Sequence, residues 1–176
     1  MPVRGKRLLR RTLLLAALDA QGAEVLSFPR MQQERRFIQH GRIDCYTHSV
    51  AVAYVSAWIA LRLHIRVDQK SLIRGALLHD YFLYDWHDGE PGHRLHGFYH
   101  ARRALENAAR DFALTPIERD VIAKHMFPLN PAVPRYRETV IVTCADKFCA
   151  VCETVSFVSW ILRLAKRYPD KTAKAP

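Results

Sequence analysis

Apolar residues recur at helical spacing along most of this chain. Between residues 46 and 63 the positions His48, Val52, Val55 and Ile59 form one stripe at intervals of three and four. These intervals match the period of an α-helix. The same spacing predicts helices over 6–20, 100–112 and 136–165. A strand is left open only at 139–143, where Val, Ile and Thr gather, so we predict an all-α fold.

Local signals mark several helix boundaries. Asp68 is a suitable N-cap for a helix that runs into the pair His79-Asp80. The run 115–118, Thr-Pro-Ile-Glu, has the pattern of a capping box with proline at the first helical position. Charged residues at 30–39 predict a short helix that ends near Gly41. The last long helix carries one apolar stripe: Val140, Cys144, Phe148, Val151 and Val155.

The stretch 81–99 breaks the helical pattern. Glycines and a proline recur in it, together with aromatic residues that include Tyr84 and Trp86. Loops of about twenty residues in compact domains are usually functional lids or disordered segments. Because the aromatic content argues against disorder, we predict a lid that shapes a substrate pocket.

The composition is that of an ordinary globular chain. Its 176 residues are 49% hydrophobic and 25% charged, and we take 1–176 as a single domain with a basic first helix and a basic C-terminal tail. No apolar run is long enough to span a membrane, and Asp19 interrupts the run near the start, which favours an amphipathic helix over a signal peptide. The cysteines indicate core residues in a reducing cytoplasm. They are Cys45, Cys144, Cys149 and Cys152.

The charge is strongly basic. Lys and Arg number 27 against 17 Asp and Glu, a formal net charge of +10, and the excess gathers at the chain ends. Such a balance suits nucleic acid, an anionic surface or a phosphorylated small substrate. No RNP, zinc-finger or glycine-rich phosphate loop accompanies the basic ends. We therefore expect a small phosphorylated substrate, with no membrane partner and no specific nucleic-acid binding, and leave the oligomeric state open.

Four ionisable residues stand at apolar helix positions: His48, His79, Asp80 and Asp146. Buried charges are costly without a partner, and imidazole with carboxylate suits a divalent transition metal. Adjacent helical side chains point about 100° apart, so His79 and Asp80 reach one ion only near a helix end. The sequence therefore predicts a metal site, with His48 and Asp146 within about 10 Å of His79.

This ordered set resembles the HD-domain superfamily of metal-dependent phosphohydrolases. The likeness covers about residues 40–150, and the segments 74–80 and 145–147 look like the usual surroundings of its motifs. It implies a compact bundle of about six or seven helices. It also implies a first divalent ion held by the four residues above, with places left for water or a substrate phosphate.

Some members of this family hold a second ion, bridged by the aspartate of the His-Asp pair. The resemblance implies His100 and His125 as its further ligands, with His96 competing for the place of His100. The family's usual double histidine is missing, because Met126 follows His125. We expect one or two ions and do not distinguish Mn, Fe, Zn, Ni, Co and Mg.

The lysine that commonly follows the family's His-Asp pair is also missing. Candidates for its phosphate-binding place are Lys124, Lys147, Arg74 and Arg137. As candidate catalytic residues we take Asp80, Lys124 and Asp85, the last as a general base or a group that orients water.

The resemblance implies hydrolysis of a phosphate monoester or diester by a metal-activated water in line with the leaving group. The segments 79–86 and 124–129 also resemble a subgroup of short bacterial HD proteins. Aromatic residues in the predicted lid make a nucleotide a reasonable substrate. Two rivals remain: a metal-retaining sensory or nucleotide-binding module without turnover, and a nucleic-acid-binding protein that uses its basic ends.

Overall fold

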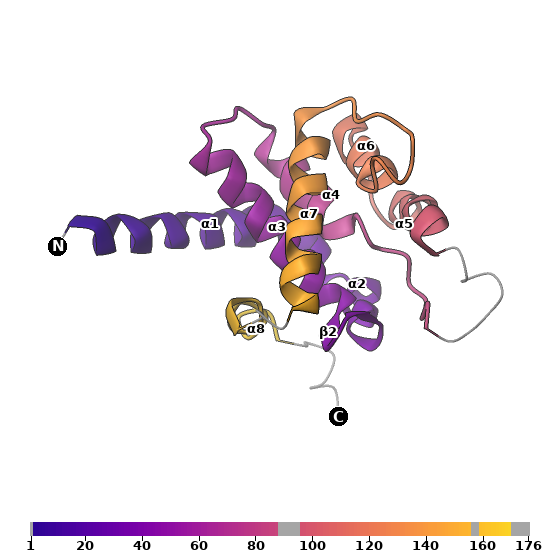
Figure 1. Ribbon diagram of the computed structural model, residues 1–176, viewed down its shortest axis with the longest axis horizontal. Helices are drawn as coiled ribbons and strands as arrows, with labels where there is room; N and C mark the ends of the chain where they lie inside the picture. Colours follow the sequence, from indigo (N-terminus) through magenta and orange to yellow (C-terminus); the bar gives the residue numbers. More distant parts are fainter. Residues whose placement is uncertain (1, 88–95, 156–158, 170–176) are drawn as a thin grey trace.

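The computed structural model describes residues 2–87, 96–155 and 159–169, which form a helical bundle (Figure 1). These ranges contain eight α-helices: α1 (Pro2–Ser27), α2 (Pro29–Gln33), α3 (Cys45–Arg62), α4 (Gln69–Leu78), α5 (His96–Asp111), α6 (Pro116–Lys124), α7 (Arg137–Thr154) and α8 (Ser159–Ala165). A 3₁₀ turn, η1 (Glu34–Arg36), leads into a small antiparallel hairpin of β1 (Ile38–His40) and β2 (Ile43–Asp44). The predicted all-α bundle is confirmed.

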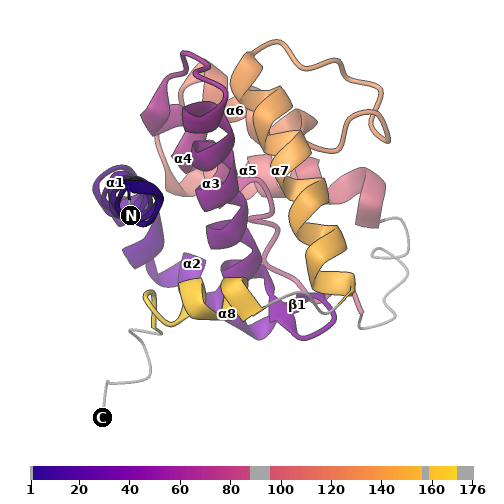
Figure 2. The same cartoon turned by 60° about the vertical axis from the view of Figure 1, so that its left-hand side comes forward.

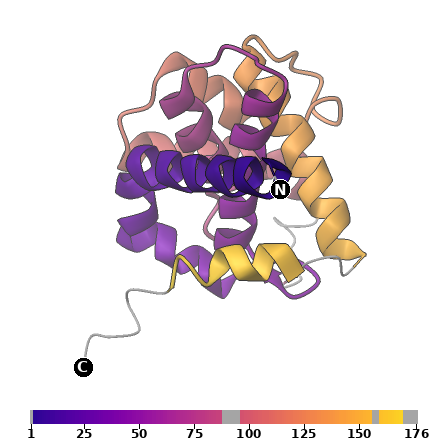
Figure 3. The same cartoon turned by 90° about the vertical axis from the view of Figure 1, so that its left-hand side faces the viewer.

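Helix α3 is the centre of the bundle. It lies between α4 and α7 (Figure 2), and small or β-branched residues such as Val50, Ala51 and Ala53 are fully buried there. Helix α1 crosses this core on one face (Figure 3) and buries Leu18 and Val25. The first half of α1 extends beyond the body of the molecule (Figure 1).

Both predicted helix starts are confirmed. The Asp68 carboxylate accepts a hydrogen bond from the Ser71 backbone N–H at 2.6 Å and caps α4. At α6 the Thr115 hydroxyl accepts from the Glu118 N–H, and the Glu118 carboxylate accepts from the Thr115 N–H. Each contact satisfies a backbone donor that has no partner within the helix.

The helix predicted over 136–165 is two helices. Helix α7 ends at Thr154, and α8 then packs on α3 and buries Ile161 and Leu164. A straight continuation would carry these two side chains away from α3. Tertiary burial of α8 therefore overrides local helix propensity.

The apolar stripe seen in the sequence of this helix faces outward. Val140, Phe148, Val151 and Val155 are each at least 50% exposed, and Cys144 is exposed while the other three cysteines are buried. The opposite side faces the core: Ile141, Val142, Ala145, Asp146 and Cys149. Both sides of α7 are apolar, so spacing alone could not tell which of them is buried.

Two predicted segment boundaries change in the structure. The helix predicted at 30–39 stops at Arg36, and the chain turns through Gly41, at φ +58°, to form the hairpin instead. The predicted loop 81–99 is shortened because α5 starts at His96. Residues 88–95 of that loop lie outside the described residues.

Helices α4 and α6 approach closely at Gly75. A Cβ built there would stand 3.0–3.2 Å from three side-chain atoms of Val121. Such distances are shorter than ordinary van der Waals contacts, so glycine allows this spacing. Among the described residues no single helix is long and apolar enough to cross a membrane, although the bent pair α7 and α8 together reaches that length and apolarity.

Candidate metal centre

His48, His79 and Asp146 meet inside the bundle from three different helices. His48 lies in the first turn of α3, His79 is the C-cap of α4, and Asp146 lies midway along α7. The Asp146 Oδ1 atom is 3.2 Å from His48 Nε2 and 3.7 Å from His79 Nε2. These separations fulfil the expectation that His48 and Asp146 lie close to His79, and the three side chains can surround one ion.

Asp80 lies between this group and a second one. Its Oδ2 atom is 3.4 Å from His79 Nε2 and 3.8 Å from His48 Nε2. Its Oδ1 atom is 3.2 Å from His100 Nε2 and 3.4 Å from His125 Nε2. The two oxygens of one carboxylate therefore face two different sets of histidines, as a bridging ligand requires.

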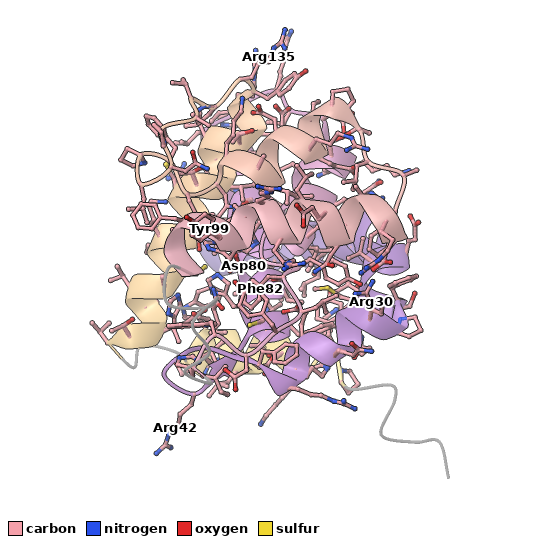
Figure 4. All side chains as sticks on the ribbon, turned by 90° about the vertical axis from the view of Figure 1, so that its right-hand side faces the viewer. Arg30, Arg42, Asp80, Phe82, Tyr99 and Arg135 are labelled. Atoms are coloured by element: carbon pink, nitrogen blue, oxygen red, sulfur yellow. The ribbon has the colours of Figure 1, made fainter. Side chains whose placement is uncertain are left out.

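His100 and His125 form the second group. Their Nε2 atoms are 2.9 Å apart, and His79, Asp80 and His125 each offer a ligand atom within 4.8 Å of the others. Figure 4 views the molecule from the side of α5 and labels Asp80 close to Phe82. The ring of Phe82 lies 6.0 Å from that of His100. The side chain of His96, the competitor for this place, lies outside the described residues.

The histidines are held so that the same nitrogen points inward. The Nδ1 atoms of His79 and His125 donate to the backbone carbonyls of Ala76 and Ile122, at 2.7 and 2.9 Å. His48 Nδ1 donates to the Glu153 carboxylate at 2.9 Å. When Nδ1 carries the proton, Nε2 keeps its lone pair and can bind a metal ion. Hydrogen-bond acceptors of this kind beside Nδ1 are typical of metal-bound histidine.

Two buried atoms of this cluster have no hydrogen-bond partner among the described residues: His79 Nε2 and Asp80 Oδ1. Unpaired buried polar atoms are rare and call for an explanation. Divalent cations in the two groups would satisfy both atoms, since each offers a lone pair. The donor set of imidazole nitrogens and carboxylate oxygens fits a transition metal or Mg²⁺.

The family model described as HD domain matches residues 45–151, more than half of the chain. The chain belongs to the HD-domain family. HD domains are generally metal-dependent hydrolases, which agrees with the donor set described above. Neither the curated proteins nor the solved structures contain a match to this chain.

The carboxylates of this metal centre lie close to its histidines, and these contacts shift their pKa values. Burial alone would raise the pKa of Asp80, but the imidazoles of His79, His100 and His125 lie close enough to favour the charged carboxylate and hold that pKa well below its usual range. The pKa of Asp146 is likewise lowered, because its contacts with His48 and His79 outweigh burial. Both carboxyls therefore stay ionised and attract cations.

The histidines of the two groups respond differently to this environment. Burial disfavours the charged form of His48, yet hydrogen bonds to Asp146 and Glu153 raise its pKa well above the usual value. Burial lowers the pKa of His125, and the nearby Asp80 carboxylate only partly offsets this shift. His125 is thus neutral near pH 7, whereas a proton competes with an ion for His48.

The other candidate residues predicted from the sequence lie at the edge of the metal centre or away from it. Lys124 Nζ pairs with Asp120 on its own helix at 2.5 Å. Asp85 accepts a hydrogen bond from the His87 backbone N–H, and its side chain is 50% exposed. Their catalytic roles stay predictions, and neither contact brings them to the histidine cluster.

Of the remaining basic candidates for binding phosphate, two have partners away from the metal centre and one lies beside it. Arg74 is buried against Glu118 and also pairs with Glu24, and Arg137 donates to the Arg66 carbonyl. Lys147 is different. Its Nζ donates to the His125 carbonyl at 3.2 Å and lies 4.0 Å from Asp146 Oδ2, so it is the basic candidate that reaches the rim of the centre.

Sequence reasoning missed three supporting residues. Gln39 Nε2 donates to Asp80 Oδ2 at 2.6 Å, and Glu153 anchors His48. Buried Glu34 accepts from the backbone N–H of Leu83, which has φ +61° and follows the His-Asp pair closely. Burial, and then the charge of Asp80, raise the pKa of Glu34 well above its usual range. A glutamate in the apolar end of α7 was the available signal for Glu153.

Proposed function

We propose that this HD protein hydrolyses a phosphate ester of a small molecule, with a nucleotide as the substrate class, and that it uses two divalent ions that share Asp80. One observation carries the proposal: buried imidazole nitrogens and carboxylate oxygens from α3, α4, α6 and α7 converge on two adjacent points, within 4.8 Å in each group. Such a cluster is costly to bury unless cations occupy it.

The first ion would be held by His48, His79, Asp80 and Asp146, and the second by Asp80, His100 and His125. When bound, such ions lower the pKa of a coordinated water toward neutrality and polarise a phosphoryl oxygen. The chain's own contribution is to keep both carboxylates ionised and His125 neutral, and to fix the rings through their Nδ1 atoms.

The rim of the centre suits a phosphorylated substrate. The ammonium group of Lys147 stands beside Asp146 and is partly exposed, where it can contact a phosphate oxygen. The ring of Tyr84 packs at 4.9 Å from Phe82, which in turn lies beside His100. Phe82 is buried, so the half-buried ring of Tyr84 is the aromatic group that can meet a substrate here; it supports a nucleobase as the rest of the substrate, because every base can stack on such a ring.

A panel assay with metal analysis tests the proposal. We expect the purified protein to contain divalent metal and to release phosphate from nucleotides or to cleave a generic phosphodiester. Asp80→Ala should abolish both metal content and turnover. Glu106→Gln, which changes an exposed acid paired with Arg102, is the control and should change neither.

A second candidate is a module that keeps the metal and binds a phosphorylated ligand without turnover. It is favoured by the pairing of Lys124 with Asp120 and by the lack of a lysine directly after the His-Asp pair. Bound metal and saturable nucleotide binding, with no product across the whole panel, would assign this function in place of hydrolysis.

A further inference from the structure

A large groove lies on another face of the molecule, away from α5 and the metal centre. It runs between the first half of α1, the second half of α3 and α8. Figure 3 shows α1 and α8 on the side of the molecule turned toward the viewer. Its volume is about 1220 Å³, above the range typical of pockets for one small ligand. We call it the α1–α3–α8 groove.

The groove is apolar although it is open to solvent. Its lining includes Leu8, Tyr54, Trp58, Ile59 and Trp160. Leu8 is 67% exposed and Trp58 47% exposed. Folded proteins rarely gather exposed apolar side chains in this way unless they bind a partner or a membrane there.

Two further leucines extend the apolar surface beyond the groove. Leu9 and Leu13 lie on the protruding half of α1 and are 61% and 54% exposed. The groove residues and these leucines therefore belong to one larger surface. An occupant confined to the groove would leave Leu9 and Leu13 in water.

The charge of this surface is of one sign. Arg10, Arg11, Arg62 and Arg163 line the groove. Apart from Phe148 of α7, all the residues that line it come from the segments 1–18, 45–67 and 159–169, which contain no acidic residue. Asp19, the nearest acid along α1, is already paired with Arg167 and Tyr168. The surface is thus complementary to an anionic, apolar partner.

We propose that this face binds the surface of an anionic phospholipid bilayer. The leucines of α1 and the rings of Trp58 and Trp160 would enter the boundary between headgroups and acyl chains, while the arginines contact lipid phosphates. Exposed leucine and tryptophan next to clustered arginine is the pattern of interfacial membrane helices. Such binding requires no membrane-spanning helix. It departs from the sequence-based expectation of no membrane partner, which considered membrane-spanning segments.

Three other occupants fit the observations less well. Nucleic-acid interfaces are mostly polar, whereas the floor of this groove is aliphatic and aromatic. A second copy of the chain would bring like-charged arginine rims together, on a protein of net charge +10. An acidic peptide helix in the groove would leave Leu9 and Leu13 uncovered.

Co-sedimentation of the full chain with phospholipid vesicles tests the proposal. We expect binding to vesicles of equal parts phosphatidylcholine and phosphatidylglycerol, weakened by salt, and no binding to phosphatidylcholine alone. Arg10→Gln with Arg11→Gln should weaken binding about thirtyfold, from the usual contribution of basic residues near an anionic surface. Leu9→Gln with Leu13→Gln should weaken it at least about tenfold through lost apolar insertion.

The matched control is Arg102→Gln with Arg103→Gln. These arginines are exposed on α5, away from the groove, and their loss changes the net charge equally. The control should keep vesicle binding, and all variants should keep the wild-type melting temperature and turnover of a soluble substrate. Equal loss of binding in the control would reveal non-specific adhesion and overturn the proposal.

Each rival occupant has its own decisive result. Binding to a generic oligonucleotide or to an acidic amphipathic peptide, without binding to anionic vesicles, would reject the membrane. A dimer that Leu8→Gln dissociates, again without vesicle binding, would assign the groove to a second copy. Vesicle binding that survives Leu9→Gln with Leu13→Gln would also contradict the proposed insertion.

Discussion

The two ligand groups of the metal centre share Asp80 but differ in how they are charged. In the first group, His48 has Asp146 on one ring nitrogen and Glu153 on the other. In the second, His125 has Asp80 on one nitrogen and a backbone carbonyl on the other. The first group therefore concentrates more negative charge, and we expect it to bind its ion more tightly.

The largest effect should come from removing the first group's own carboxylate. Asp146→Asn keeps the shape but removes the charge, so the first ion should be lost and turnover should fall at least about a thousandfold, corresponding to several kcal/mol of transition-state stabilisation. Metal content by elemental analysis and initial rates measure both effects. Full activity with an unchanged metal content would show that Asp146 is no ligand.

The second group should tolerate damage better. In His125→Ala the first group stays intact, so we expect the metal content to fall from two ions to one and turnover to fall on the order of a hundredfold. The stoichiometry is the decisive readout. If His125→Ala emptied both sites while the protein stayed folded, the two groups would not be separable.

Glu153 sharpens the comparison because it contacts only the first group. Glu153→Gln should reduce the affinity for the first ion by about ten- to a hundredfold, as the loss of such supporting partners typically does. The control is Glu138→Gln, another buried glutamate of α7, whose carboxylate accepts from the Asp68 backbone N–H instead. Competition with a metal chelator measures both, and a similar loss in the two variants would argue against the role of Glu153.

The pH should separate the two ions without any mutation. Ligands must lose their protons to bind metal. Because the pKa of His48 is raised, protons should displace the first ion as the pH falls through a value above 6.5. Because the pKa of His125 is lowered, protons should displace the second ion only at a pH below 6.5. At limiting metal, the affinity of the first group should fall about tenfold per pH unit below the His48 pKa. Loss of the second ion at the higher pH would reverse this assignment.

Glu34 should give the smallest effect. The pKa of Glu34 is raised in the folded state. Its contribution to the free energy of unfolding is therefore complete below about pH 4.5, and it is lost progressively as the pH rises toward the folded-state pKa. Glu34→Gln keeps the acceptor for Leu83 and cannot ionise, so it should be no less stable than the wild type, with an advantage that grows with pH. Denaturant unfolding at several pH values checks this, and a variant destabilised equally at every pH would contradict it.

The sequence correctly predicted the features that depend on residues a few positions apart along the chain. The capping side chains of Asp68 and Thr115 act on backbone groups a few residues away, and the His79-Asp80 pair stands at a helix end as expected. The set of candidate metal ligands could be predicted because its residues stand along the chain in an order known from the HD-domain family. The HD assignment followed from that order and not from composition.

What the sequence did not predict depends on contacts across the fold. Val140 and Phe148 have the same spacing as core residues, and only packing decides that they face solvent. Gln39 reaches Asp80 because the hairpin replaces the end of a predicted helix. None of these choices is visible in the local pattern.

The missing side chain at Gly75 has a consequence for ion size. Gly75 sits where α4 meets Val121 of α6, and the C-caps of these two helices are His79, which precedes Asp80, and His125. An alanine there would force a shift of a few tenths of an ångström. That is comparable with the difference in bond length between ions, roughly 2.0–2.1 Å for Mg²⁺ against 2.3–2.6 Å for Ca²⁺. For the second ion proposed above, we therefore expect the spacing at this glycine to influence which ionic radius the site accepts.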